Sequence, residues 1–171
     1  VKYLVEKGAD VNTKFNYKNN YNNIAEPVKS KTALIIASEK ENLEMVKYLI
    51  QKGASHISEA LTYATTSGNF EIVKYLVDEG ADVNAKYVYH DRFNNDISKT
   101  VLIISSEKEN WDIVKYLVEK GADVNAKYKD NNHIDTTKTA LSIASEKKNL
   151  ELVKYLIEKG ADNIDYALSI A

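Results

Sequence analysis

The sequence predicts an all-α solenoid, in which helix-turn-helix hairpins stack side by side, with irregular finger loops along one edge and little or no β-strand. Two observations predict this fold. The stretch Val-Lys-Tyr-Leu-(Val/Ile)-x-x-Gly-Ala occurs five times, starting at Val1, Val46, Val73, Val114 and Val153. A second segment precedes each of the last four copies at a constant offset of 12 residues, counted from its marker leucines Leu34, Leu61, Leu102 and Leu141. A constant offset indicates one rigid hairpin, and such hairpins stack because none can bury its apolar face alone.

The repeated stretch has the pattern of the end of an amphipathic helix. Its Val, the Leu three positions later and the β-branched residue that follows lie on one face, a spacing typical of a helix packed on one side. A glycine then ends the helix, because glycine adopts the left-handed conformation without steric cost. Five of the six glycines of the chain occupy this position: Gly8, Gly53, Gly80, Gly121 and Gly160.

The first helix of each hairpin has its own start signal. Thr32, Thr100 and Thr139 are predicted to cap it, because a threonine hydroxyl can accept a hydrogen bond from a free backbone N–H. The turn to the second helix ends in asparagine, which we expect to cap that helix in the same way. The asparagines concerned are Asn42, Asn69, Asn110 and Asn149.

The connections between hairpins vary in length, always at the same point of the unit. They are long after Gly8, Gly80 and Gly121, and too short for a finger after Gly53 and Gly160. Insertions at one fixed point map to one edge of a stacked array. We therefore divide the single domain into 1–30 (second helix and long finger), 31–57 (repeat with a short connection), 58–98 and 99–137 (repeats with long fingers), 138–162 (repeat with a short connection) and 163–171 (first helix of a truncated repeat).

These motifs resemble those of the ankyrin-repeat family. That family has Thr-x-Leu-x-x-Ala in the first helix and (Ile/Val)-Val-x-x-Leu-Leu-x-x-Gly-Ala-Asp-Val-Asn through the second, and Ile72 to Asn84 and Ile113 to Asn125 match the second motif closely. The family's turn glycine survives only as Gly68. Glu41, Glu109 and Lys148 stand in its place, and a left-handed backbone there would cost roughly 1 kcal/mol each.

Composition excludes several classes of partner. The chain has 171 residues, of which 44% are hydrophobic and 28% charged, with a net charge of −2, so nothing in its charge favours nucleic acid or an anionic membrane. It contains no cysteine, which suits a reducing compartment, and no apolar run approaches the roughly 20 residues of a membrane span. We expect a monomeric, intracellular and cytoplasmic protein. Because the chain starts in a second helix and ends in a first helix, we also expect it to be a fragment of a longer array.

No pattern in the sequence indicates catalysis. The three histidines lie in connections without the converging partners that a metal site needs, and the carboxylates recur in register with lysines, as on a solvated helix face. Phosphate-binding loops, nucleophile elbows and catalytic triads are absent from the sequence. We therefore expect no enzyme activity, no metal, no cofactor and no small-molecule substrate.

The resemblance implies that the chain binds another protein on its concave side. Aromatic and arginine side chains on loops of a rigid scaffold are frequent anchors of such binding. Alternatively, the finger aromatics fold back on the first helices. The predicted finger residues are Phe15, Tyr17, Tyr21, Tyr87, Tyr89, Arg92, Phe93, Tyr128 and His133. The predicted residues of the first helices are Ile35, Glu39, Thr62, Thr66, Ile103, Glu107, Ser142 and Glu146.

Two further sets of residues recur in register. Tyr3, Tyr48, Tyr75, Tyr116 and Tyr155 form a stripe, read either as rings half-buried against the next repeat's second helix or as a docking surface. The resemblance implies that Asn12, Asn84 and Asn125 brace the finger bases and are possible substrates of an asparaginyl hydroxylase.

Three functions fit the sequence. The chain is a non-catalytic protein–protein interaction module, or the targeting arm of a larger enzyme or ubiquitin-ligase adaptor, or a structural spacer without a dedicated partner. A spacer would tolerate removal of the fingers, whereas a binding module would not.

Overall fold

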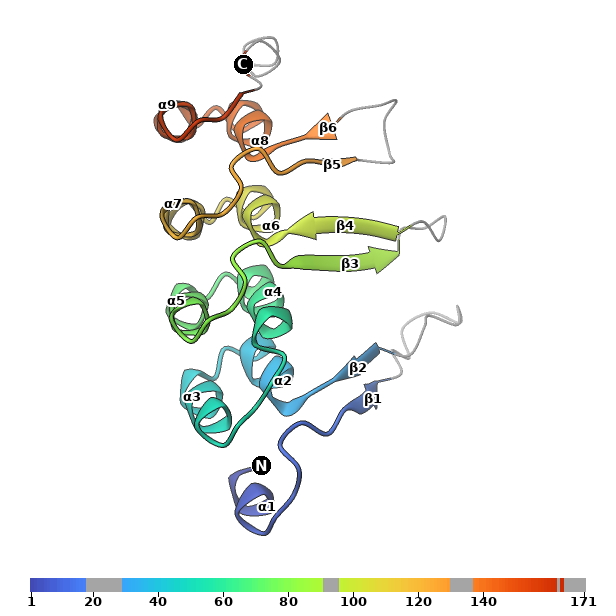
Figure 1. Cartoon of the computed structure of the whole chain (residues 1–171). Helices are drawn as coiled ribbons and strands as arrows, with labels where there is room; N and C mark the ends of the chain where they lie inside the picture. The colour runs from blue at the N-terminus through green and yellow to red at the C-terminus, as the bar shows by residue number, and fades with distance from the viewer. Residues whose placement is uncertain (18–28, 91–95, 130–136, 163, 165–171) are drawn as a thin grey trace.

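The computed structural model describes residues 1–17, 29–90, 96–129, 137–162 and 164. Its helices form two columns that run the length of the molecule, which confirms the predicted solenoid (Figure 1). The first helices of the hairpins form one column: α2 (Ala33–Glu39), α4 (Ile57–Ser67), α6 (Val101–Glu107) and α8 (Ala140–Glu146). The second helices form the other: α1 (Lys2–Glu6), α3 (Leu43–Gln51), α5 (Phe70–Asp78), α7 (Trp111–Glu119) and α9 (Leu150–Glu158).

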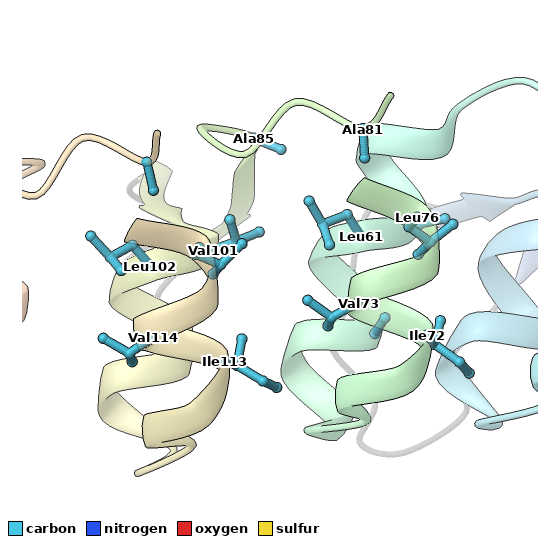
Figure 2. Close-up of a cluster of buried hydrophobic side chains, with 14 of the residues drawn as sticks. Leu61, Ile72, Val73, Leu76, Ala81, Ala85, Val101, Leu102, Ile113 and Val114 are labelled. Carbon is cyan, nitrogen blue, oxygen red and sulfur yellow. The ribbon is translucent and has the colours of Figure 1, made fainter. Parts of the chain in front are cut away.

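One continuous apolar core joins the hairpins. The marker leucines Leu34, Leu61, Leu102 and Leu141 are each at most 1% exposed and belong to the same cluster, because α2, α4, α6 and α8 pack against one another in order. Figure 2 shows two successive layers of this core, with Leu61 and Val73 in one and Leu102 and Val114 in the next. Repeats distant in sequence therefore share one elongated interior, as the constant offset predicted.

Most of the predicted caps are present. The hydroxyls of Thr32, Thr100 and Thr139 accept hydrogen bonds from the backbone N–H groups of Ile35, Ile103 and Ser142, respectively. Side-chain oxygens of Asn42, Asn69 and Asn149 accept from Met45, Ile72 and Leu152 in the same way. Where the family's turn glycine is replaced, the backbone is left-handed, with φ of 57° at Glu41, 60° at Glu109 and 56° at Lys148.

Asn110 is the exception, because its side chain makes no capping hydrogen bond to α7. It lies instead against Gly68 of the preceding repeat, where a Cβ atom added to the glycine would come within 2.8 Å of the Asn110 Nδ2. The one turn that keeps its glycine therefore has room for the neighbouring asparagine to leave its capping position.

The fingers are more regular than the sequence analysis predicted. Each long connection contains an antiparallel pair of strands that projects beyond the column of first helices (Figure 1). The pairs are β1 (Phe15–Tyr17) with β2 (Lys29–Lys31), β3 (Lys86–His90) with β4 (Asp96–Thr100), and β5 (Tyr128–Lys129) with β6 (Thr137–Lys138). Tyrosine and valine alternate along 87–89, and this alternation favours a strand.

The fingers are unevenly spaced along the stack. Hairpins β1–β2, β3–β4 and β5–β6 precede α2, α6 and α8, but α4 follows a short connection and has no finger. Strands β2 and β3 therefore face each other across a repeat without a finger, whereas β4 and β5 contact each other (Figure 1).

The tyrosine stripe joins consecutive second helices. The hydroxyls of Tyr48, Tyr116 and Tyr155 donate to the backbone carbonyl oxygens of Lys2, Lys74 and Lys115 in the preceding repeat, at 3.3, 3.4 and 3.2 Å. All three rings are half-buried. The structure thus favours packing over docking for the stripe, but the partner is the preceding second helix and not the next one, as had been predicted.

Candidate functional site

The surface of interest is the finger face, which is formed by strands β1 to β6 and the first helices α2, α4, α6 and α8. Each finger is held at its base by a lysine in its last strand that reaches the glutamate ending the following helix. The three pairs are Lys31 with Glu39 at 2.7 Å, Lys99 with Glu107 at 2.7 Å, and Lys138 with Glu146 at 2.9 Å. The same eight-residue spacing recurs in every repeat that has a finger, so the pair belongs to the finger rather than to the helix.

The pair in the second finger is the most elaborate. Lys99 donates to both carboxylate oxygens of Glu107, its Nζ lies 4.4 Å from the centre of the Tyr128 ring, and the Tyr128 hydroxyl donates to Glu107 at 2.6 Å. Burial lowers the pKa of Lys99, but the hydrogen bonds and charge of Glu107 outweigh burial and leave that pKa above its ordinary value. Lys99 therefore stays charged and ties two fingers to α6.

A small second core supports the same region. Ile97 of β4, Ile103 of α6, Tyr128 of β5 and Ile143 of α8 pack together, and Tyr89 lies against them. The second and third fingers are consequently fixed to the first helices by apolar packing as well as by charge. A pre-organised surface loses less conformational entropy when it binds a partner.

Replacing Lys99 by Met is expected to destabilise the chain by about 2 kcal/mol, because Glu107 and the Tyr128 ring both lose their cation in a partly buried site. The matched control is Lys138→Met, which removes the equivalent ion pair in a position where no ring contact exists among the described residues. Urea unfolding should show less than about 1 kcal/mol for the control. Equal losses would contradict the role assigned to the rings.

Aromatic side chains continue from the fingers onto the fingerless helix. We call Tyr63, Tyr87 and Tyr89 the aromatic row. The rings of Tyr63 on α4 and Tyr87 on β3 meet edge to face at 5.5 Å, and those of Tyr87 and Tyr89 stack at 6.0 Å. Lys31 Nζ lies 4.6 Å from the centre of the Tyr63 ring, so a lysine of the first finger reaches this row. Burial and the neighbouring Tyr87 raise the pKa of Tyr63 well above its ordinary value, so the Tyr63 hydroxyl keeps its proton.

A cavity of about 380 Å³ opens where the finger is missing. One wall is Ser30 of β2, the opposite wall is Lys86–Val88 of β3, and the floor is Glu59, Thr62 and Tyr63 of α4. Its volume lies within the range of ordinary binding pockets.

The structure leaves part of the predicted binding surface accessible. Phe15 in β1 is 56% exposed, and Thr66 and Glu146 are exposed at the ends of α4 and α8. Glu39 and Glu107 are partly exposed but engaged by their lysines. Tyr87 and Tyr89 are half-buried in the aromatic row, which supports the alternative that finger aromatics fold back on the first helices.

Other predicted residues must be corrected. Ile35, Thr62, Ile103 and Ser142 are at most 2% exposed, and Tyr128 is 7% exposed, so these side chains offer no free surface to a partner. The reason is clearest for Ile103 and Tyr128, because they are buried in the second core where β4 and β5 cover the first helices. Tyr21, Arg92, Phe93 and His133 lie outside the described residues, and of Tyr17 only the backbone is described.

Ile36 and Tyr63, which share one register position on the first helices, were not among the residues predicted from the sequence. Ile36 is 39% exposed, and Tyr63 forms the floor of the cavity. A signal for Tyr63 was present in the sequence, because Ile36, Ile104 and Ile143 occupy this position in the three repeats that follow a long connection. The lysines at the finger bases were also missed, although their spacing to glutamate is constant.

The recurring asparagines brace the connections, as predicted. Asn12 Nδ2 donates to the Gly53 carbonyl oxygen at 3.1 Å and Asn12 Oδ1 accepts from the Ser55 N–H at 2.7 Å. Asn84 Oδ1 accepts from the Asp123 N–H at 2.8 Å. Asn125 binds across to the next connection in the manner of Asn12. Each asparagine therefore joins its own connection to the following one, and its hydroxylation stays a prediction.

Among the described residues, no group of three or more histidine, aspartate or glutamate side chains could hold a metal ion. None of the described helices combines the length and the apolar character that crossing a bilayer requires.

Stacked helical hairpins with a row of β-hairpin fingers along one edge define a helical-repeat protein. A family model described as ankyrin repeats (3 copies) matches residues 1–87 and again residues 88–166, so the chain belongs to the ankyrin-repeat family. Ankyrin repeats are generally protein–protein interaction modules and are typically non-catalytic. No match was found among curated proteins.

Proposed function

We propose that this chain is a non-catalytic module that binds a protein partner through its finger face. The observation that carries the proposal is the exposure of apolar side chains on a surface whose scaffold is held rigid. Phe15 on β1 and Ile36 on α2 are 56% and 39% exposed, and they lie next to the finger base fixed by Lys31 and Glu39. Exposed apolar side chains on a fixed frame favour binding, because few groups must be ordered when the partner arrives.

The opposite surface, formed by the second helices, is used differently. Its lysines and acids pair between repeats, as Lys115 does with Glu151 and Lys120 with Asp78. Such exposed pairs contribute little to affinity or stability. The second helices also carry two exposed apolar side chains on α9, Leu150 and Ile157, which serve as a matched control.

The test compares two double variants in binding to a partner identified by affinity purification and mass spectrometry. Phe15→Ala with Ile36→Ala is expected to weaken binding about tenfold or more, since truncating an apolar anchor commonly costs above 1 kcal/mol. Leu150→Ala with Ile157→Ala is expected to change affinity less than about twofold. Circular dichroism should show the same helical content for both variants.

The other outcomes separate the alternatives. If the control on α9 weakens binding instead, the partner uses the second helices and the finger face is the wrong surface. If shaving the fingers has no cellular consequence and neither double variant changes any interaction, the chain is a spacer. A targeting arm would bind in the same way, and a catalytic or degradation-adaptor domain in the full open reading frame would identify it.

A further inference from the structure

Within the part of the chain that the structure describes, the gap left by the missing finger has an open strand edge on one side. The Val101 N–H donates to the Ala85 carbonyl oxygen at 3.0 Å, which fixes the direction of the backbone groups along β3. Because hydrogen-bonded and non-hydrogen-bonded pairs alternate in an antiparallel ladder, Tyr87 and Tyr89 face β4. Lys86 and Val88 therefore direct their N–H and C=O groups away from β4, towards the side of β3 that faces β2 (Figure 1).

The cavity runs along this edge. It is lined by three consecutive residues of β3, Lys86 to Val88, although neighbouring side chains of a strand point to opposite faces. A cavity that touches all three must follow the backbone edge rather than one face of the hairpin. Ser30 of β2 stands on the far side, and Tyr63 closes the bottom.

The row of fingers lacks two strands at the gap, because α4 follows a connection without a strand pair. Adjacent strands lie about 4.8 Å apart, and each missing finger removes two strands from the row. The neighbouring fingers show the normal spacing, since β4 and β5 are in contact. One added strand can therefore pair with β3 and still leave room for its side chains against β2.

We infer that this gap takes an extended segment of the protein partner, which adds to the edge of β3 as an antiparallel or parallel strand. The inference deepens the proposed function and rests on it. Main-chain hydrogen bonds to Lys86 and Val88 provide the affinity, and alternate side chains of the segment provide the specificity. A strand edge with unpaired N–H and C=O groups is a ready template for pairing with another chain.

The lining defines the chemistry of the segment. Lys86 and Glu59 are exposed and of opposite sign, and Lys31 is paired with Glu39, so these charges around the gap cancel. A segment without net charge fits best. The side chain that it directs to the floor meets the Tyr63 ring, and an apolar or aromatic residue suits that contact.

The test uses a proline at position 88. Because the Val88 N–H points away from β4, Val88→Pro removes a donor from the open edge and leaves the β3–β4 ladder intact, as proline does on edge strands. The matched control is Ser98→Pro, since Ser98 is the direct cross-strand partner of Val88 and its N–H points away from β3, to the opposite edge. Short linear peptides selected from a random phage-displayed library on the whole chain serve as the probe.

Val88→Pro is expected to lower the affinity of the chain for the selected peptides about tenfold, whereas Ser98→Pro should change this affinity less than about twofold. Glu59→Trp, which fills the cavity from an exposed lining position, should also abolish binding and keeps the test valid if Val88→Pro disturbs the finger. In the complex with the unaltered chain, hydrogen exchange at the Lys86 and Val88 amides should become slow.

Several results would overturn the inference: selection of no linear peptide, equal binding to Val88→Pro and the unaltered chain, or fast exchange at both amides in the complex. If a partner binds the Phe15 and Ile36 double variant more weakly but binds Val88→Pro normally, the proposed function is supported. Only strand addition is then contradicted. A partner indifferent to all of these variants removes both.

Discussion

Replacing Leu61 by Ala is expected to destabilise the chain by about 3 kcal/mol, in the range measured for buried leucines that leave a cavity behind. Leu61 is completely buried, and its helix α4 packs against α2, α5 and α6, so the loss falls in the centre of the stack (Figure 2). Urea unfolding followed by circular dichroism measures the change. Since repeats are held by their neighbours, weakening the central one should also broaden the transition or split it in two.

The matched control is Leu150→Ala on α9, where the leucine is 65% exposed. Substitutions of exposed residues usually change stability by less than about 0.5 kcal/mol. Comparable losses at the two positions would mean that the marker leucines do not form the shared interior on which the solenoid depends.

The sequence was sufficient for the helical part of this fold, because repetition makes each position testable several times. A single threonine before an apolar segment is a weak signal, but Thr32, Thr100 and Thr139 in one register are a strong one, and all three cap their helices. Asn110 shows where the local rule stops. Its repeat has the same sequence motif as the others. The Asn110 side chain nevertheless lies against Gly68 of the neighbouring repeat and not in the capping position.

The finger face was less predictable, because burial there is decided by segments that come from different repeats. Helical spacing placed Ile103 on the side of the fingers, but only the packed strands reveal that Ile97 and Tyr128 cover it. The cavity is likewise invisible in any single repeat. It exists because one connection is short while its neighbours are long, and the lengths alone did not show that β2 and β3 would flank it.

Alkaline unfolding is the second large effect expected. Tyrosine has an ordinary pKa of 10.0, and in the folded chain the pKa of Tyr63, Tyr75, Tyr116 and Tyr155 is raised, chiefly by burial. At Tyr63 the neighbouring Tyr87 and Glu59 raise it further. The folded state thus holds these protons more tightly than the unfolded state. Their contribution to stability is fully present below about pH 10 and is lost as the pH rises above it.

Charged pairs act in the same direction. The pKa of Lys99 is raised by Glu107 against the opposing effect of burial, so this pair also stabilises the folded chain until the lysine deprotonates. The urea midpoint should therefore stay level from neutral pH to about pH 10 and then fall steeply. The part of the tyrosinate absorbance that comes from these half-buried rings should rise together with the loss of helical circular dichroism, because opening of the stack removes the burial that raises their pKa.

Tyr63→Phe tests whether ionisation of Tyr63 contributes to the alkaline loss of stability. Phenylalanine keeps the ring that packs against Tyr87 but has no proton to lose, so the fall of the urea midpoint above pH 10 should become shallower. Tyr3→Phe is the control, because Tyr3 is 68% exposed and its replacement should leave the slope unchanged. The test compares the slopes of the urea midpoint above pH 10. Stability at neutral pH is not compared, because loss of the hydroxyl can change it independently of ionisation. A midpoint that stays constant well above pH 10 would show that the Tyr63 ring is open to solvent, and the cavity floor would then not be the closed surface on which a partner strand could rest.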